Sequence, residues 1–135
     1  MKVVVIDGQG GKMGQMLITQ IKSSNITCEV TAIGTNSIAT SVMLKAGADV
    51  GATGENPAVL ASREADVIIG PVGIISADSL LGEISPAMAV AVGQSKAMKL
   101  LLPVNLCNNI IVGTRSLTLA KLIDEAVEEL KKIVN

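Results

Sequence analysis

Apolar and polar positions along the chain alternate in blocks that predict strands and helices in turn. Residues 2–7 (KVVVID) form a short β-branched run of the kind found in central parallel strands. The next apolar positions, Met13, Leu17 and Ile21, recur at helical spacing and predict a helix. Glycines separate the two segments, so the chain opens with a strand, a glycine turn and a helix.

The same alternation continues to the last helix. Further strands are predicted at 26–33, 48–52, 66–75 (which ends in glycines) and 99–104, with 109–113 (NIIVG) as a candidate sixth strand. Helices are predicted at 36–46, about 57–65 and 86–94, each of the latter two opened by a capping residue before proline, and from Leu119 to Ile133. This order predicts one α/β domain over residues 1–135, with three layers and an open, mostly parallel sheet of five or six strands.

Composition excludes several kinds of site. The chain has a formal net charge of -1 and no His, Phe, Tyr or Trp, so we expect no nucleic-acid partner, no imidazole catalysis and no aromatic stacking of bases. Cys28 and Cys107 form no CxxC pair, which predicts free thiols and no metal site. The longest charge-free runs, 30–44 and 100–114, are shorter than the roughly 20 residues that span a bilayer. We therefore expect a soluble, cytoplasmic protein with no membrane partner.

The glycine turn (GQGGKMG, residues 8–14) is the main candidate for a binding site. Glycine lets the backbone approach a phosphate closely, and a helix N-terminus offers free N–H groups with a partial positive charge. Gly8, Gly11 and Gly14 follow a G-x-x-G-x-x-G spacing, a variant of the dinucleotide fingerprint G-x-G-x-x-G. The residues predicted to hold a nucleotide here are Gly8, Gln9, Gly10, Gly11, Lys12, Met13 and Gly14, with Lys12 as a phosphate contact.

Two features complicate a simple NAD site. An acid usually lies about 20 residues beyond the glycines to hold the ribose, but Gly34, Thr35 and Asn36 contain no carboxylate. Their polar groups suit an anion such as the 2′-phosphate of NADP, or one of Thr35, Asn36 and Ser37 simply caps the second helix. Asp7 directly precedes the turn, where it would repel a pyrophosphate unless it binds Mg²⁺, a ligand hydroxyl or the backbone of its own turn; we favour the last.

The other wall of the site is expected where the strand order reverses, between the first and fourth strands. The segment Gly70, Pro71, Val72 and Gly73 should face the glycine turn, and its glycines admit a ligand, serve a bend around Pro71, or do both. Further polar candidates near strand ends are Thr53, Glu55, Asn56, Ser76, Asp78, Ser79, Glu83, Asn105, Asn108 and Asn109. Asp78 or Glu83 is a candidate general base, and the catalytic residues, if any, stay unassigned.

The turn from Gly8 to Gly14 resembles that of the dihydrodipicolinate reductases, in which the same glycine spacing is followed by a basic residue, Met and Gly. In that family the turn holds the pyrophosphate of a nicotinamide cofactor, and the resemblance implies this role for the matching positions here. It covers only about residues 2–20, and that family's substrate domain and histidine motif have no counterpart, so its reaction is not implied.

A second resemblance covers the whole chain. The segments VIDGQGG, AIGTNSIATSVMLKAGA, GATGEN, VIIGPVGII, LLGEISPAMA and LLPVNLCN, in this order, resemble an uncharacterised family of short bacterial proteins, a conserved domain of unknown function. This resemblance implies one stand-alone Rossmann-like domain and supplies no reaction.

Three functions fit these observations. The first is a small nucleotide-binding protein with NADP(H) or NAD(H) at the crevice between the first and fourth strands; the second is a minimal cofactor-dependent oxidoreductase, against which the absence of His and Tyr argues. The third is a ligand-free oligomeric scaffold. A mean hydropathy of +0.54 leaves apolar surface to cover, so we expect a homo-oligomer, such as a homodimer, through the C-terminal helix or an edge strand. Under the first two, Gly11→Ala or Gly14→Ala should abolish binding with modest loss of stability.

Overall fold

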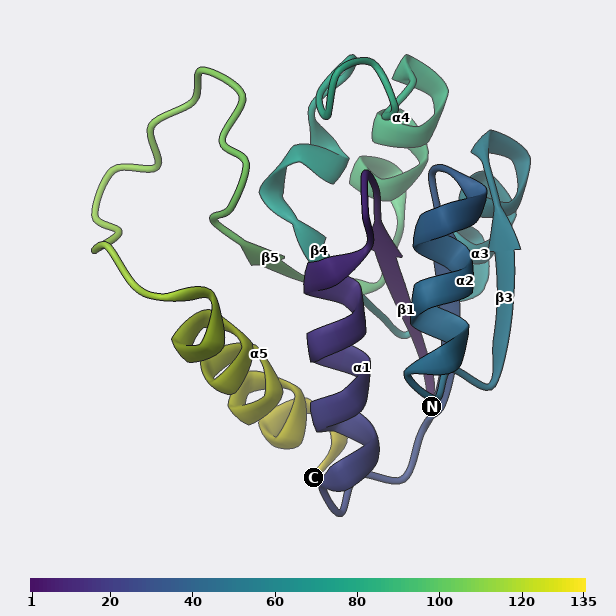
Figure 1. The fold of residues 1–135 in the computed structure, drawn as a ribbon, viewed down its shortest axis with the longest axis vertical. Coiled ribbons are helices and arrows are strands. Elements are labelled where there is room, and N and C mark those ends of the chain that lie inside the picture. The colour runs from purple at the N-terminus through teal and green to yellow at the C-terminus, as the bar shows by residue number, and fades with distance from the viewer.

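The computed structural model describes residues 1–135 and contains one parallel sheet of five strands with helices on both faces (Figure 1). The strands are β1 (Lys2–Asp7), β2 (Glu29–Gly34), β3 (Val50–Thr53), β4 (Val67–Pro71) and β5 (Met98–Leu102). The helices are α1 (Lys12–Ser23), α2 (Ser37–Lys45), α3 (Glu55–Glu64), α4 (Pro86–Gln94) and α5 (Leu119–Val134), with a short 3-10 helix η1 (Val72–Ile75). The predicted Rossmann-like α/β class and the three-layer arrangement are confirmed.

The strand order is β3-β2-β1-β4-β5, and every neighbouring pair is parallel. β1 lies at the centre, and its residues Val3–Asp7 are buried, as expected for a strand covered on both faces. The chain builds β2 and β3 on one side of β1 and then returns to place β4 on the other. The order therefore reverses between β1 and β4, and in open parallel sheets the ligand crevice usually lies at the carboxyl ends of the strands at such a point.

Each face of the sheet has its own apolar core. One core packs α1, α2 and α5 against Val3 and Val5, and the other packs α3, α4 and the segment after β4 against Val4 and Ile6. In Figure 1, α1, α2 and α5 lie in front of the sheet and α3 and α4 lie behind it. Because the chain has no aromatic residues, Ile, Leu, Val and Met fill both cores. No helix combines the length and the apolar content that crossing a bilayer requires.

The prediction of a sixth strand at 109–113 is wrong. Residues 103–118 connect β5 to α5 without any strand, and this loop extends away from the sheet in light green in Figure 1. The reason lies just before the predicted strand, where Asn105, Cys107 and Asn108 adopt positive φ angles of 51°, 50° and 65° and bend the chain away from the edge of β5.

Other boundaries shift by a few residues. The strand predicted at 66–75 ends at Pro71 and continues as η1, and the helix predicted at 57–65 begins at Glu55. The predicted strand at 26–33 begins only at Glu29. None of these shifts changes the order of the elements.

Candidate functional site

The glycine turn joins β1 to α1 beside the crevice, and its glycines serve different purposes. Gly11 is the N-cap of α1 with a φ of 75°, and a Cβ there would lie 2.8 Å from Cα of Ala39 in α2. A Cβ at Gly14 would collide with the side chain of Met43 in the same helix. These two glycines therefore allow α1 to pack closely against α2. A Cβ at Gly10, in contrast, would meet no atom within 4 Å, so Gly10 is the glycine of the turn that faces open space.

Asp7 holds the turn from beneath. Its side chain is only 5% exposed; Oδ1 accepts a hydrogen bond from the backbone N–H of Gly8 and Oδ2 one from that of Gly14, each at 2.8 Å. Burial raises the pKa of the Asp7 carboxyl, the bonds from Gly14 and Gly8 lower it, and nearby Glu83 raises it again, so that the net pKa lies above its ordinary value. Of the three roles considered for Asp7, the structure confirms the bond to the backbone of its own turn.

The first turn of α1 still has free donors. The backbone N–H groups of Gly10, Lys12 and Met13 make no hydrogen bond within the protein. They border a hollow of about 250 Å³ that is closed on its other side by Val104 and Asn105 after β5 and by Leu119 at the start of α5. The side chain of Lys12 is exposed and forms no ion pair. Free N–H groups, a helix dipole and an unpaired ammonium together favour an anion.

Glu83 joins the three loops that meet at the crevice. It lies in the segment between η1 and α4, and its Oε1 accepts hydrogen bonds from the backbone N–H of Gln9 at 3.0 Å, Oγ1 of Thr35 at 2.5 Å and Nδ2 of Asn36 at 2.8 Å. Desolvation raises the pKa of Glu83, but the bonds from Thr35, Gln9 and Asn36 outweigh it, and the net pKa is lowered. An ionised carboxylate therefore lies between the loops that follow β1 and β2.

The end of β2 is shaped by capping. Oδ1 of Asn36 accepts from the backbone N–H of Ala39 at 2.9 Å and caps α2, which confirms the capping interpretation of this stretch. Nδ2 of Asn36 also donates to the carbonyl of Gln9 at 2.8 Å. Gly34 leaves no room for a side chain, since a Cβ would lie 2.7 Å from the carbonyl oxygen of Asn36. The side-chain donors of Thr35 and Asn36 already have partners within the protein, so these side chains offer no free donor to a 2′-phosphate, and a phosphate at this point stays a prediction.

The segment from Gly70 to Gly73, at the end of β4 and the start of η1, is packed closely against its neighbours. Gly70, Pro71 and Gly73 are buried and Val72 is half-buried. A Cβ at Gly70 would lie 2.6 Å from the carbonyl oxygen of Ile6, and the carbonyl of Gly73 accepts a 2.5 Å hydrogen bond from Ser79 Oγ. These contacts show that Gly70 and Gly73 serve the backbone geometry, and a role of this segment in ligand binding stays a prediction. None of the four residues lines the hollow at the glycine turn.

The other polar candidates are dispersed. Asn105 lines the hollow, whereas Asn108 and Asn109 lie on the exposed loop after β5. The side chain of Asp78 is exposed and makes no hydrogen bond. Three more of these candidate side chains form hydrogen bonds within the protein: Thr53 with Thr40, Glu55 with Ser85, and Ser79 with the carbonyl of Gly73. Ser76 is half-buried, and Asn56 is exposed in the first turn of α3.

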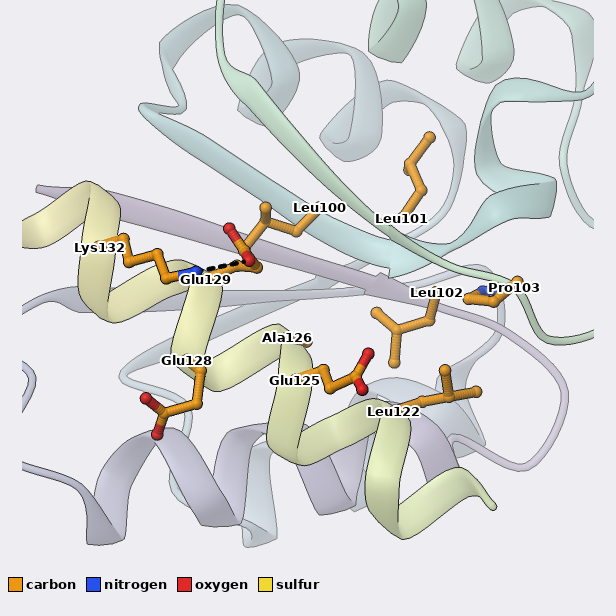
Figure 2. Close-up of a pocket in the computed structure, with 10 residues that line it drawn as sticks. All are labelled: Leu100, Leu101, Leu102, Pro103, Leu122, Glu125, Ala126, Glu128, Glu129 and Lys132. Atoms are coloured by element: carbon orange, nitrogen blue, oxygen red, sulfur yellow. Dashed lines mark hydrogen bonds and ion pairs between the residues drawn. The ribbon is translucent and has the colours of Figure 1, made fainter. Parts of the chain in front are cut away.

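A more apolar groove lies on the outer edge of the sheet, between β5 and α5. Figure 2 shows its apolar side chains, which include Leu100, Leu102 and Leu122, and the charged residues of α5 beside them, with Lys132 bonded to Glu129 at 3.0 Å. Its volume is about 370 Å³. The groove lacks the free backbone donors of the glycine turn and adjoins an unpaired strand edge, a setting typical of protein contacts.

Comparison with known proteins identifies a family and no activity. No curated protein matches the chain. Among solved structures, a dodecameric FMN-dependent UbiX-like decarboxylase from Escherichia coli O157:H7 is similar over 98% of this chain and 94% of that chain, with 13% sequence identity and a TM-score of 0.44. So distant a likeness carries no argument about ligand or assembly.

The local likeness of the turn to the dihydrodipicolinate reductases gains no support from these comparisons and stays a resemblance of residues 2–20. The family described as "Domain of unknown function (DUF3842)" matches residues 2–135. That match spans nearly the whole sequence, and the chain therefore belongs to the DUF3842 family.

Proposed function

We propose that the protein is a nucleotide-binding module whose phosphate site is the N-terminus of α1. The observation that carries this proposal is the set of free backbone N–H groups of Gly10, Lys12 and Met13 around a hollow at the carboxyl end of the central strand. Such donors bind phosphate without help from a charged side chain. Gly10 keeps the approach open because it has no side chain, and the exposed ammonium of Lys12 adds a positive charge.

The buried Asp7 does not prevent phosphate binding in this arrangement. Both of its carboxylate oxygens already accept hydrogen bonds from the backbone, which offset its charge, and burial shifts its pKa upward toward the neutral form. The residues present therefore fit a phosphate group in front of the turn.

A nicotinamide dinucleotide, NAD(H) or NADP(H), is our first candidate ligand. In parallel sheets with this strand order, the pyrophosphate of such a cofactor lies at the first strand-to-helix turn. When bound, the cofactor would supply hydride transfer; the chain itself would bind and orient it through Gly10, Lys12 and Met13.

We favour binding over catalysis because neither acid has the environment of a general base. Asp78 is exposed to solvent, and three hydrogen bonds lower the pKa of Glu83, which weakens it as a proton acceptor. A role in sensing the cofactor, or in presenting it to a catalytic partner, fits this site better than a self-contained oxidoreductase.

The binding proposal is tested by placing a negative charge at the phosphate site. Gly10→Asp adds a carboxylate where a side chain meets no other atom, and Gly93→Asp makes the same change at a glycine of α4 that is equally uncrowded. NADH, NADPH, ATP and FMN would be titrated in thermal-shift and calorimetric assays. At a hundredfold excess over its Kd, a ligand should stabilise the wild-type protein by about 2.7 kcal/mol.

We expect Gly10→Asp to weaken binding at least about tenfold, which is about 1.4 kcal/mol, and Gly93→Asp to leave it unchanged. Equal binding by the two variants would contradict a phosphate site at the turn. Absence of binding by every nucleotide would remove the proposed function altogether.

We also propose that two copies associate along β5. The outer edge of this strand is unpaired, and the following loop exposes Ile110 and Val112 by 88% and 93%. Large apolar side chains this exposed, beside an open strand edge and the groove of Figure 2, are typical of a surface that a partner covers. A second copy is the occupant we assign, because residues 109–113 have the β-branched pattern of a strand that could pair with that edge.

A further inference from the structure

We propose that Glu83 makes the site select an unmodified ribose, so that NADH binds more tightly than NADPH. This inference rests on the proposed nucleotide-binding function and deepens it, since it names which of the two cofactor classes the site accepts. It is the opposite of the 2′-phosphate that the polar groups of Thr35 and Asn36 suggested as one alternative in the sequence.

The position of the carboxylate is the first step. Dinucleotide sites on parallel sheets usually hold the adenosine ribose with an acid at the end of the second strand. β2 ends at Gly34 and supplies no acid, but Thr35 and Asn36, the two residues that follow it, both donate hydrogen bonds to Glu83. The missing acid therefore reaches the end of β2 from the segment before α4, far away in the sequence.

The free acceptor on Glu83 is the second step. Its Oε1 takes all three of its hydrogen bonds, from Gln9, Thr35 and Asn36, whereas Oε2 takes none. A ribose hydroxyl can donate to Oε2, but an ionised 2′-phosphate has no proton to donate and brings its own negative charge. Glu83 forms no ion pair, so its negative charge is not neutralised by a paired cation.

The third step is the rigidity of residues 78–84, the segment that carries Glu83. If this segment were mobile, the carboxylate could turn away from a phosphate and would not discriminate against it. Leu80 is buried beside Gly8, and the backbone bonds from Asp78 to Ile84 at 2.7 Å and from Ile84 to Ser79 at 3.2 Å close the segment on itself. The three donors then fix the carboxylate before any ligand arrives, which reduces the ordering cost of binding. Glu83 is thus a specificity residue held in place.

The test is the Kd for NADPH divided by the Kd for NADH, with both constants measured by calorimetry. In the wild-type protein this ratio should be about ten or more. Like charges at hydrogen-bonding distance near a protein surface repel each other strongly enough to weaken binding by at least that factor. Glu83→Gln keeps the size of the side chain and an oxygen for the three donors but removes the charge. We expect it to lower the ratio about tenfold, mainly through tighter binding of NADPH.

Glu29→Gln is the matched control, because it removes the same charge from an exposed residue at the opposite end of β2. It should leave the ratio unchanged. A merely structural role for Glu83 would weaken both ligands alike, and that result would overturn the inference. The wild-type ratio tests it even if Glu83→Gln fails to fold.

The outcomes also separate this inference from the proposed function. Tighter binding of NADPH by wild-type protein, lost in Gly10→Asp, would refute the role of Glu83 and leave the phosphate site standing. If neither cofactor binds, the inference fails, and the proposed function fails with it only if ATP and FMN do not bind either.

Discussion

Gly11→Ala should destabilise the protein strongly, whatever it does to a ligand. Gly11 is buried with a φ of 75°, and holding an L-residue in this conformation costs about 1–2 kcal/mol. A Cβ there would also lie 2.8 Å from Cα and 3.1 Å from the carbonyl oxygen of Ala39, and helix backbone cannot move aside as a flexible side chain can. Overpacking of this kind costs about 1–3 kcal/mol. The two effects together predict a loss of about 2–5 kcal/mol in the free energy of unfolding.

Urea denaturation of both proteins at one protein concentration measures this loss, because a single domain of this size is expected to unfold in one cooperative step and the fixed concentration keeps any contribution from association equal. Gly93→Ala is the control: its Cβ would meet nothing within 4 Å, and alanine in a helix should stabilise by about 0.5–1 kcal/mol. If Gly11→Ala stays within about 0.5 kcal/mol of wild type while nucleotide binding is lost, the packing argument is refuted. Gly11 would then be a ligand-contacting glycine, as the sequence alone suggested.

Further predictions concern pH and assembly. The pKa of Asp7 is raised in the folded protein. Its contribution to stability is therefore fully present below the pKa that Asp7 has in the unfolded chain, and it is lost as pH rises through the folded pKa. The urea midpoint of wild type should accordingly fall relative to that of Asp7→Asn from about pH 4 upward. Glu83 has the opposite sign, because its lowered pKa makes its contribution disappear as pH falls through the folded pKa, so wild type should lose its advantage over Glu83→Gln below about pH 4. Light scattering after gel filtration should show a dimer for wild type and a monomer for the double variant Ile110→Asp, Val112→Asp. The control Ile38→Asp changes another exposed apolar residue and should stay dimeric. A monomeric wild type would contradict the proposed contact.

The order of elements was predictable because it depends on local patterns. The β-branched run at 2–7 marks the central strand, and Ser85 before Pro86 marks the start of α4, where its side chain caps Met88 as expected. The strand predicted at 109–113 failed because a β-branched pattern states only a preference. Left-handed residues just before it turn the chain away from the edge of β5. Two of them, Asn105 and Asn108, are of the type that tolerates this conformation, but the residue type alone does not show that they adopt it.

The site was predictable only in part, for a related reason. The glycine turn could be found from its spacing, yet spacing does not tell which glycine faces a neighbouring helix and which faces open space. Gly11 and Gly14 proved to be packing glycines, and Gly10 the open one. Glu83 could be named only as one acid among several, because its partners Gln9 and Thr35 lie 74 and 48 residues away. Contacts over such separations come from the fold and leave no local signal.

The central claim is that the free N–H groups at the start of α1 bind the phosphates of a nucleotide. Two-dimensional ¹H–¹⁵N NMR during a titration with NADH reports on those groups one by one. We predict that the amide signals of Gly10, Lys12 and Met13 move most and saturate together, while those around Leu122 in the groove of Figure 2 stay in place. Unchanged signals at the turn, or changes confined to the groove, would contradict the claim.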